Sequence, residues 1–329
     1  MKVFVTGGTG FIGANLVRHL VARGDEVVAL VRKPNLCLEG LPIRMVQADI
    51  TDADALAPLV RGCGGIYHVA GLFDASPGGI ARMREIHVYG TQALLRAAER
   101  EGVPRLVLCS SSVTVGFGSK EQPGDEETPL DPGAIYGATG ALRAYHDTKL
   151  QSEKMAAGWG GVEAIIVNPD YILGAWDVKP TSGQLIVTMA KGMVPVYPKG
   201  GKCFQDADDC ALGHILAMER GQPGRRYLLG NQNLSYLEFM TMVAEVVGRR
   251  PPFLAVPDFA LGLAGAVGEQ LLALDPHRFA GLDPNVLRSM RQERYRSGDR
   301  AARELGVPRT PIRESVEKAY RWFKDHGYC

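Results

Sequence analysis

The sequence predicts an α/β fold, in which a doubly wound parallel sheet is joined to a smaller, mostly helical C-terminal lobe. Three observations in the 329 residues support this expectation. Short β-branched runs alternate with helical patterns in the first half, a glycine-rich turn separates the first run from the first helix, and the second half loses the alternation. Such alternation is typical of parallel strands joined by right-handed crossovers, with helices on both faces of the sheet.

The elements of the first half are expected in regular succession. Apolar runs rich in β-branched residues predict strands at Lys2–Val5, Glu26–Val31, Ile43–Ala48, Ile66–Ala70, Arg105–Cys109 and Val162–Val167. Apolar residues at helical spacing predict helices at Phe11–Ala22, Asp54–Arg61, Val88–Arg100 and Leu142–Ala157. Gly24 stands where the first helix needs a C-terminal cap.

The second half is less regular, with many Gly, Pro and turn residues from Pro169 to Gly201. One strand is expected at Arg226–Leu229. Helices are expected at Tyr236–Val247 and Phe259–Leu274. A third helix would be capped by Ser297 and end at Glu304. A fourth would run to Lys324, with Thr310 as its cap and Pro311 at its first position. The change of pattern predicts two parts, at residues 1–169 and 170–329, with a soft boundary and some elements of the second part returning to the sheet.

Composition excludes several classes of protein. The 37 Lys and Arg balance 36 Asp and Glu, so no general electrostatic attraction to nucleic acid or to an anionic membrane is expected. The closest cysteines, Cys203 and Cys210, are seven residues apart and the His residues are scattered, which argues against a metal site or a disulfide framework. No signal-peptide pattern opens the chain, and the most apolar late segment, Phe259–Gly268, is far shorter than the roughly 20 residues of a membrane span. A cytoplasmic protein is expected.

The turn Thr6–Gly13, with the sequence TGGTGFIG, has glycines at 7, 10 and 13 between the first strand and the first helix. The first glycine permits a tight turn, the second lets the backbone approach a pyrophosphate, and the third allows close packing of helix and strand. Because a helix N-terminus also favours an anion, this turn predicts dinucleotide binding. We therefore expect residues 1–169 to form a Rossmann-type dinucleotide-binding domain and residues 170–329 to form a substrate-binding lobe.

The residues that would read the cofactor's adenosine end are basic. Arg32 and Lys33 stand at the end of the second expected strand, where an acidic residue would accept a hydrogen bond from a free ribose 2′-hydroxyl. A guanidinium and an ammonium suit a 2′-phosphate instead, so NADP(H) is favoured over NAD(H), unless both are simply solvated loop residues. Asp49 is placed for an adenine contact, or equally for a turn or a helix cap.

Three side chains suggest carbonyl chemistry. Tyr145 and Lys149 are spaced i,i+4 and therefore share one helix face, and Ser110-Ser111-Ser112 closes the strand Arg105–Cys109. The tyrosine would donate a proton to a carbonyl oxygen, the lysine would lower the tyrosine pKa and bind the nicotinamide ribose, and a serine would hold the oxygen. Taken alone, the Tyr–Lys pair could also be an ordinary surface pair.

These residues carry a family resemblance. The TGGTGFIG turn, the run Arg105–Ser111 and Tyr145 with Lys149 are similar to the motifs of the extended short-chain dehydrogenase/reductase family, within the NAD-dependent epimerase/dehydratase superfamily. The segments Tyr67–Gly71, Asn168-Pro169 and Arg300–Gly306 resemble further family signatures. Within the family the chain looks most similar to the dihydroflavonol-4-reductase-like and hopanoid-associated sugar-epimerase-like branch.

The resemblance implies particular site residues. It places the catalytic serine at Ser111, or at Ser112 if the strand end slips by one residue, beside Tyr145 and Lys149. It implies cofactor contacts, in addition to Tyr145, Lys149, Arg32 and Lys33, from Gly7, Thr9, Gly10, Phe11, Ile12, Gly13, Asp49, Ile50, Val69, Ala70, Gly71, Pro169 and Ile172. His87 departs from the family, which usually has an asparagine there that ties strand ends together, and it is expected to be a structural substitute or a proton relay.

Residues at the ends of the strands help to decide which of the reactions known for this fold the chain could catalyse. Dehydratases of this kind have acidic residues after the strand-end hydroxyl, whereas this chain has Ser112-Val113 there. Epimerases usually present an acidic residue to the ribose of NAD, and Arg32 stands at that position here. Many nucleotide-sugar enzymes also have an arginine for the diphosphate shortly before Asn168, where this chain has the apolar run Ile165–Val167. We therefore expect an NADPH-dependent reductase of a ketone or aldehyde on a small, apolar or aromatic metabolite. A nucleotide-sugar epimerase or dehydratase and a non-catalytic NADP-binding regulator are the alternatives.

The sequence leaves the substrate unnamed and gives weaker expectations for the lobe. The region 170–201 and the helix at 259–274 would roof the pocket, with Tyr171, Trp176 and Phe204 as walls or as ordinary core. The apolar faces near Val88 and Leu142 allow a homodimer, although burial against the sheet explains them equally.

Overall fold

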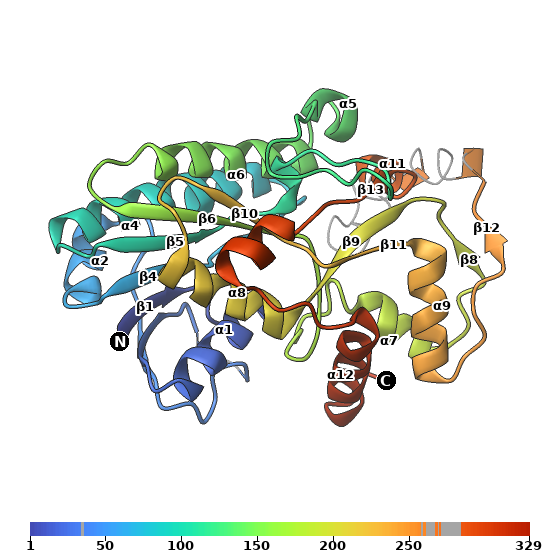
Figure 1. Cartoon of the computed structure of the whole chain (residues 1–329), viewed down its shortest axis with the longest axis horizontal. Coiled ribbons are helices and arrows are strands. Elements are labelled where there is room, and N and C mark those ends of the chain that lie inside the picture. Colours follow the sequence, from blue (N-terminus) through green and yellow to red (C-terminus); the bar gives the residue numbers. More distant parts are fainter. Residues whose placement is uncertain (34–35, 258, 261–266, 269, 271–283) are drawn as a thin grey trace.

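The computed structural model describes the chain except residues 34–35, 258, 261–266, 269 and 271–283. Its centre is a seven-stranded sheet in the order β10-β6-β5-β4-β1-β2-β3, with every neighbouring pair parallel (Figure 1). The strands are β1 (Lys2–Thr6), β2 (Glu26–Leu30), β3 (Arg44–Val46), β4 (Gly65–His68), β5 (Arg105–Cys109), β6 (Glu163–Pro169) and β10 (Arg226–Leu229). This order reverses direction after β1, as doubly wound dinucleotide-binding sheets do, and ligands of such sheets bind at the carboxyl ends of the strands.

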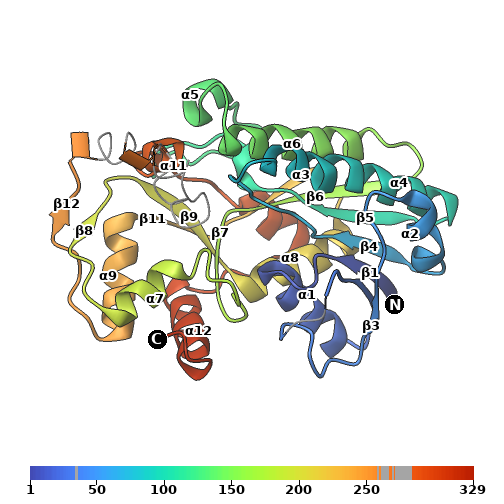
Figure 2. The same cartoon turned by 180° about the vertical axis from the view of Figure 1, so that it is seen from behind.

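Helices cover both faces of this sheet, as the strand–helix alternation predicts (Figure 2). One face packs on α1 (Phe11–Ala22) and α8 (Ala207–Arg220). The other packs on α2 (Ala53–Val60), α4 (Gly90–Arg100) and α6 (Ala141–Ala157). Each face buries its own apolar cluster, which explains why the strands are almost wholly apolar.

Most expected elements of the first half are present within a few residues of their predicted bounds. The helix expected at Val88 begins further upstream, because α3 (Gly79–Arg84) continues through the π-helical turn η1 (Glu85–Tyr89) into α4. Two short helices of this half were not expected, namely η2 (Ser112–Thr114) and α5 (Pro132–Tyr136), and in the second half neither α7 (Gln184–Lys191) nor α8 was expected.

The lobe contains a second sheet that the sequence did not predict. Its strands run in the order β11-β9-β13, with β7 also paired to β9, and a separate two-stranded ladder joins β12 to β8. The strands are β7 (Tyr171–Leu173), β8 (Val196–Tyr197), β9 (Gly201–Asp206), β11 (Gln232–Ser235), β12 (Leu254–Ala255) and β13 (Glu293–Arg294). Most are too short to show a period-2 pattern, which is why the region read as irregular.

Around this sheet lie α7 (Gln184–Lys191), α9 (Tyr236–Val247), α11 (Pro284–Ser289), the π-helical turn η4 (Ala301–Leu305) and α12 (Ile312–Asp325). The helix α9 has the bounds that the sequence predicts. The expectation that Ser297 caps the next helix is wrong, because Arg300 is the N-cap of η4 and no side chain caps this turn, although Ser297 accepts a hydrogen bond from the Asp299 amide. The expected helix at 259–274 falls mainly outside the described residues. None of the described helices combines the length and apolarity needed to cross a bilayer.

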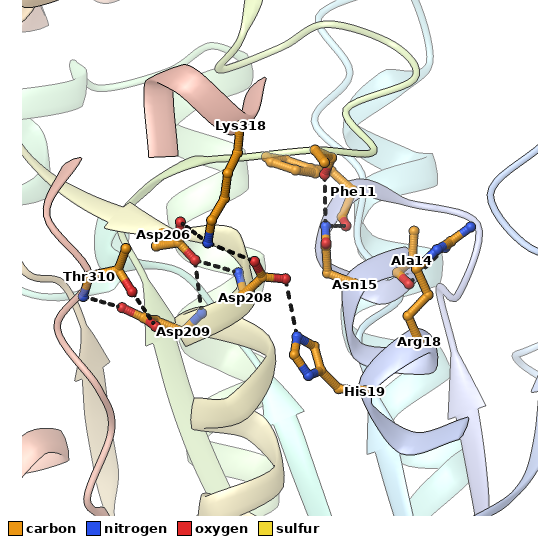
Figure 3. A network of polar contacts seen from close by, with 11 residues as sticks. Phe11, Ala14, Asn15, Arg18, His19, Asp206, Asp208, Asp209, Thr310 and Lys318 are labelled. Atoms are coloured by element: carbon orange, nitrogen blue, oxygen red, sulfur yellow. Dashed lines mark hydrogen bonds and ion pairs between the residues drawn. The ribbon is translucent and has the colours of Figure 1, made fainter. Parts of the chain in front are cut away.

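The expected start of the last helix is wrong by a small but informative margin. Pro311 is the N-cap of α12 rather than its first residue, and no side chain caps this helix. Thr310 instead donates from its amide (2.7 Å) and its hydroxyl (3.0 Å) to the Asp209 carboxylate on α8 (Figure 3). As a cap, the Thr310 hydroxyl would accept from helix amides, but here it donates to a buried carboxylate in a charge-assisted hydrogen bond, so Thr310 is joined to α8.

The same region joins the sheet to the lobe. Lys318 on α12 pairs with Asp208 (2.9 Å) and Asp206 (3.4 Å), and His19 on α1 contacts Asp208 at 3.1 Å (Figure 3). Asp206 also caps α8 through the amides of Asp208 and Asp209. The N-terminus of α8 is therefore the shared anchor of the cofactor-side helix α1 and the C-terminal helix α12.

Candidate active site

The glycine-rich turn after β1 has the geometry that its sequence predicts. Gly7 has φ +73°, and a Cβ there would lie 2.5 Å from the Ala70 amide nitrogen. A Cβ on Gly13 would lie 2.1 Å from the Gly7 carbonyl oxygen, so no side chain fits at that position either. A Cβ on Gly10 would be less crowded, because it would lie 3.3 Å from the same Gly7 carbonyl oxygen. The turn thus packs directly on the chain that leaves β4.

The helix behind this turn has an N-terminus suited to an anion. Gly10 is the N-cap of α1, no side chain caps the helix, and its first turn contains no acidic residue. The backbone amides and the helix dipole therefore favour a negative group there. With the cradle that excludes a Cβ at Gly7 and Gly13, these features fit the pyrophosphate of a dinucleotide.

The predicted adenosine-end residues lie at the next strand ends. Arg32 and Lys33 are exposed just beyond β2, and neither makes an ion pair within the described part of the chain. Asp49 accepts from the amide (2.9 Å) and the hydroxyl (2.8 Å) of Thr51, which lowers the pKa of its carboxyl group, so it forms the turn that leads into α2. Ile50 packs on the start of α4, where a Cβ on Gly90 would lie 3.3 Å away.

The structure brings the three predicted catalytic residues together. The Tyr145 phenol lies beside the Ser111 side chain, which acts to lower the tyrosine pKa. Lys149, one turn further along α6, is buried and donates from Nζ to the Cys109 carbonyl oxygen at 2.9 Å. A Cβ on Gly71 would lie 3.1 Å from the same Nζ, so Lys149 lies between the ends of β4 and β5.

The neighbouring cofactor-side positions line the same edge. Ala70 donates from its amide to the Thr6 hydroxyl at 3.2 Å and lies against Gly7, which connects the catalytic group to the glycine-rich turn. The other predicted cofactor residues also lie on or beside this edge: Thr9, Phe11 and Ile12 at the start of α1, Val69 after β4, Pro169 at the end of β6 and Ile172 on β7.

Of the two candidate serines, Ser111 faces Tyr145. Its Oγ also accepts from the Val113 amide at 3.4 Å, as the N-cap of η2. Ser112 is the first residue of η2 and only 6% exposed. The third serine, Ser110, is turned away and donates to the buried Glu153. This geometry favours Ser111 as the residue that would hold a carbonyl oxygen.

Glu153 is a member of the site that sequence reasoning missed. Its Oε1 accepts from Ser110, from the Thr114 hydroxyl (2.6 Å) and from the Asn168 amide (2.7 Å), while Oε2 lies 2.7 Å from Arg226 on β10. These bonds hold both ends of the turn that carries Ser111. The available signal was its i,i+4 spacing from Lys149, which puts both residues on one face of α6.

The electrostatics of the pair differ from expectation in one respect. Burial raises the pKa of Tyr145 to about 12, although the neighbouring Ser111 side chain acts in the opposite direction. The expectation that Lys149 lowers this pKa is therefore wrong for the protein alone, because its ammonium is committed to the Cys109 carbonyl. Burial also lowers the pKa of Lys149.

His87 has the structural role of a connector. Its Nε2 accepts from the Leu72 amide (3.0 Å), so the neutral ring donates from Nδ1 to the Thr148 hydroxyl (2.9 Å). Burial, with the charge of Lys149, lowers the pKa of His87 to about 2. Both nitrogens are engaged and the ring stays neutral, which favours the structural substitute over the proton relay.

A second buried histidine supports the glycine-rich turn. His68 at the end of β4 contacts the Thr6 hydroxyl through Nδ1 (2.8 Å) and the Thr91 hydroxyl through Nε2 (3.0 Å). Complete burial lowers the pKa of His68 to about 3. It therefore joins the strand before the glycine-rich turn to α4 as a neutral bridge.

The three predicted aromatic walls belong to the core and to the junction of the lobe. Phe204 is fully buried and stacks on Phe239 with ring centroids 4.3 Å apart, and the Tyr171 ring lies 5.2 Å from Phe204. Trp176 lies under the Arg18 guanidinium of α1, 3.3 Å from the ring centroid, and beside Trp322. These contacts favour the ordinary-core alternative, because packing within the lobe and against α1 accounts for all three rings.

Comparison with known proteins agrees with this geometry. The model of the NAD dependent epimerase/dehydratase family matches residues 3–230. A putative dihydroflavonol 4-reductase of Synechocystis sp. is 34% identical over 99% of this chain and 95% of its own length. Sterol demethylase protein B of Methylococcus capsulatus is 30% identical over 99% of each chain.

A solved structure extends the agreement to three dimensions. The crystal structure of gox2253 superposes with a TM-score of 0.84 and 32% identity, covering 99% of each chain. The glycine-rich turn, the sheet order and these matches over nearly the whole length lead to one assignment. The chain belongs to the NAD-dependent epimerase/dehydratase family, the extended short-chain dehydrogenases/reductases.

Proposed function

We propose that this protein is an NADPH-dependent reductase that converts a ketone or aldehyde of a small metabolite into an alcohol. The observation that carries the proposal is the position of the Tyr145 phenol beside Ser111, next to Lys149 and the glycine-rich turn. The relative named as a putative dihydroflavonol 4-reductase supports a reductive reaction over epimerisation.

Each side chain of the site has a separate role toward the carbonyl group of the substrate. A reduced nicotinamide, when bound at this edge of the sheet, supplies the hydride that the carbonyl carbon accepts. Ser111 and Tyr145 donate hydrogen bonds to the carbonyl oxygen, and Tyr145 transfers its proton as negative charge develops there. A phenol with its pKa raised to about 12 is fully protonated at neutral pH, as an acid in the reductive direction must be. Lys149, which donates to the Cys109 carbonyl in the protein alone, would bind the nicotinamide ribose.

The preference for NADPH is inferred from Arg32 and Lys33. Both are exposed beyond β2, and neither is committed to an ion pair among the described residues. A 2′-phosphate would give both cations a partner. We expect Arg32→Asp to lower the affinity for NADP(H) about 10-fold or more, measured by calorimetric titration against NADPH and NADH. An unchanged ratio of the two affinities would contradict this part of the proposal.

The alternatives receive less support from the site. Dehydration needs a carboxylate at the strand end, and the carboxylate near the serine turn, Glu153, is buried and paired with Arg226. A regulator without turnover does not need a tyrosine held against a serine. Neither alternative explains the arrangement of Ser111, Tyr145 and Lys149 as well as carbonyl reduction does.

The test uses purified protein, NADPH and a panel of ketones and aldehydes, with loss of NADPH absorbance as the readout. Tyr145→Phe should reduce turnover by a factor of about 1,000 while NADPH affinity changes less than about threefold. The conservative control Tyr89→Phe alters an exposed tyrosine on η1 and should retain activity. Equal activity of Tyr145→Phe and the unmodified protein, or inertness of both toward every carbonyl, would overturn the proposal.

A further inference from the structure

A cluster of charged residues lies between the lobe sheet and the turn that carries Ser111. It contains Lys202 on β9, Arg294 on β13, Arg296 just beyond β13, and the carboxylate of Asp170 after β6. Lys202 and Arg294 are register partners in the parallel pairing of the two strands, although they are far apart in sequence. Three cations and one carboxylate therefore meet beside the candidate active site.

Arg296, one of these cations, has partners for all three nitrogens of its guanidinium. Arg296 pairs with Asp170 through Nη1 at 2.7 Å, and it donates from Nε to the Gly116 carbonyl and from Nη2 to the Val115 carbonyl, each at 3.0 Å. This arginine connects the lobe to the chain that follows the Ser111 turn. Its charge is neutralised by Asp170, which leaves no carboxylate in the cluster for the other two cations.

The other two cations form no ion pair in the described part of the chain, although the charge of Asp170 acts on both from a longer distance. Arg294 is only 6% exposed and donates from Nη2 to the Tyr136 hydroxyl at 2.6 Å, but its Nε has no hydrogen-bond partner. Its guanidinium lies 5.4 Å from the Phe117 ring centroid. Lys202 has its ammonium 4.7 Å from the Tyr171 ring centroid and forms no ion pair with a described residue.

Such an arrangement is costly for stability alone. A buried charge without a counterion loses its hydration, and two cations beside one another also repel. Burial and the charge of Arg294 lower the pKa of Lys202 to about 8, so the ammonium still carries its charge through most of the population at neutral pH. A methionine or leucine pair would pack against Phe117 and Tyr171 without this cost. The cluster is better suited to hold an oxyanion, which would satisfy both charges.

The location of the pair connects it to the reacting groups. Arg294 donates to the Tyr136 hydroxyl, and Tyr136 donates in turn to the Val113 carbonyl at 3.0 Å. The Val113 amide donates to Ser111 Oγ. A ligand group at Lys202 and Arg294 is therefore separated from the Ser111 turn by a single tyrosine side chain, on the lobe side of the turn.

We propose that Lys202 and Arg294 bind an oxyanion of the substrate, a carboxylate or a phosphate, while its carbonyl group is held at Ser111 and Tyr145. This inference rests on the proposed carbonyl reduction and defines its substrate class as an anionic ketone or aldehyde. It revises the sequence-based expectation of a purely apolar or aromatic metabolite. Arg294 and Lys202 become specificity-determining residues, whereas Arg296 with Asp170 fixes the frame that carries them.

The test compares two ketones of nearly equal shape, 4-acetylbenzoate and its neutral amide 4-acetylbenzamide, with NADPH. The intact protein should show a value of kcat/KM about 30-fold higher for the carboxylate than for the amide. Lys202→Met should bring this ratio close to one. Lys199→Met, which removes an exposed lysine of the same loop, should leave the ratio unchanged. Arg294→Lys keeps the charge but loses the planar fork, and should give an intermediate ratio.

A binding measurement separates failure of the subsite from failure of the proposed reaction. Calorimetric titration with 4-acetylbenzoate and with inorganic phosphate is made on the intact protein, Lys202→Met and Lys199→Met. If neither ketone is reduced but an anion binds and only Lys202→Met abolishes the binding, the subsite is upheld and the reductase proposal fails. If both ketones are reduced equally well, the subsite is overturned and the reductase proposal stands. Absence of anion binding together with absence of any preference overturns the subsite in every case.

Discussion

The two parts of this molecule treat their polar groups in opposite ways. In the dinucleotide-binding half, His68 and His87 are neutral and doubly hydrogen-bonded, and the buried Lys149 donates to a backbone carbonyl. In the lobe, Lys202 and Arg294 form no ion pair with a described carboxylate. The buried polar groups of the first half thus satisfy one another, whereas those of the lobe would be satisfied by the anionic substrate group that we propose. Under this proposal, the contrast assigns substrate selection to the lobe.

The most severe test of this contrast replaces Gly13. A Cβ in Gly13→Ala would lie 2.1 Å from the Gly7 carbonyl oxygen, so the turn must open to accept it. We expect NADPH affinity to fall about 100-fold or more, measured by calorimetric titration. Gly160→Ala is the control, because nothing lies within 4 Å of its added methyl group. Retained affinity in Gly13→Ala would show that the scaffold half is less rigid than the contrast requires.

The next largest effect is expected at Glu153. Glu153→Gln removes the charge opposite Arg226 and weakens the bonds to Ser110 and Asn168, leaving a partly buried cation unpaired. The free energy of unfolding should fall by about 2–3 kcal/mol, and kcat should fall more than NADPH affinity because the Ser111 turn loosens. Denaturant unfolding and steady-state kinetics measure the two effects. The exposed pair Glu163–Arg105 gives the control Glu163→Gln, and an equal loss in both variants would remove Glu153 from the site.

A smaller change in the stability of the fold is expected when the pH is lowered. The pKa of His87 is lowered to about 2 in the folded protein, whereas in the unfolded chain it is near 6.5, so the unfolded chain binds the proton first as pH falls. Stability should therefore decline below about pH 6.5, by up to about 1.4 kcal/mol per pH unit for each such histidine. His87→Asn, which keeps an acceptor and a donor, should make the decline between pH 7 and pH 5 shallower. A slope identical to that of the intact protein would mean that His87 is not held neutral.

The smallest effect concerns the joint between the halves. Lys318→Met removes the cation beside Asp206 and Asp208, and because Lys318 is 40% exposed the loss should be only about 1 kcal/mol. Lys318 and His19 hold the pKa of Asp208 at about 2, below its unfolded value, so this contribution is present above about pH 4 and is lost as pH falls toward 2. Thermal unfolding at pH 7 and pH 3 checks both statements. A loss that is the same at both pH values would contradict the assignment.

The scaffold half was largely predictable because its constraints are local. Gly7 and Gly13 are required by contacts within a few residues of the turn and with the next strand end, and the i,i+4 spacing of Tyr145 and Lys149 determines their common face. The choice of Ser111 over Ser112 needed the backbone path of η2. Glu153 was missed because its partners come from three separate elements, β5, β6 and β10.

The lobe was less predictable because its contacts are distant in sequence. Strands β7, β8 and β13 have only two or three residues, which is too few for a pattern. Lys202 and Arg294 become neighbours only through the pairing of β9 with β13. Tyr171, Trp176 and Phe204 had the composition of a pocket wall but pack inside the lobe, since composition does not say which side of a sheet a ring faces.

The return of β10 to the sheet has a consequence for synthesis of the chain. A ribosome that has released the chain only to Pro169 has delivered Ser111, Tyr145 and Lys149, to which we assign the reaction, yet β10 and Arg226 have not been made. Glu153 then lacks its cation, and β6 is an open edge available to any extended peptide. The first 169 residues should therefore not mature alone as a functional unit, and the growing chain needs roughly 60 more residues before its catalytic edge can close.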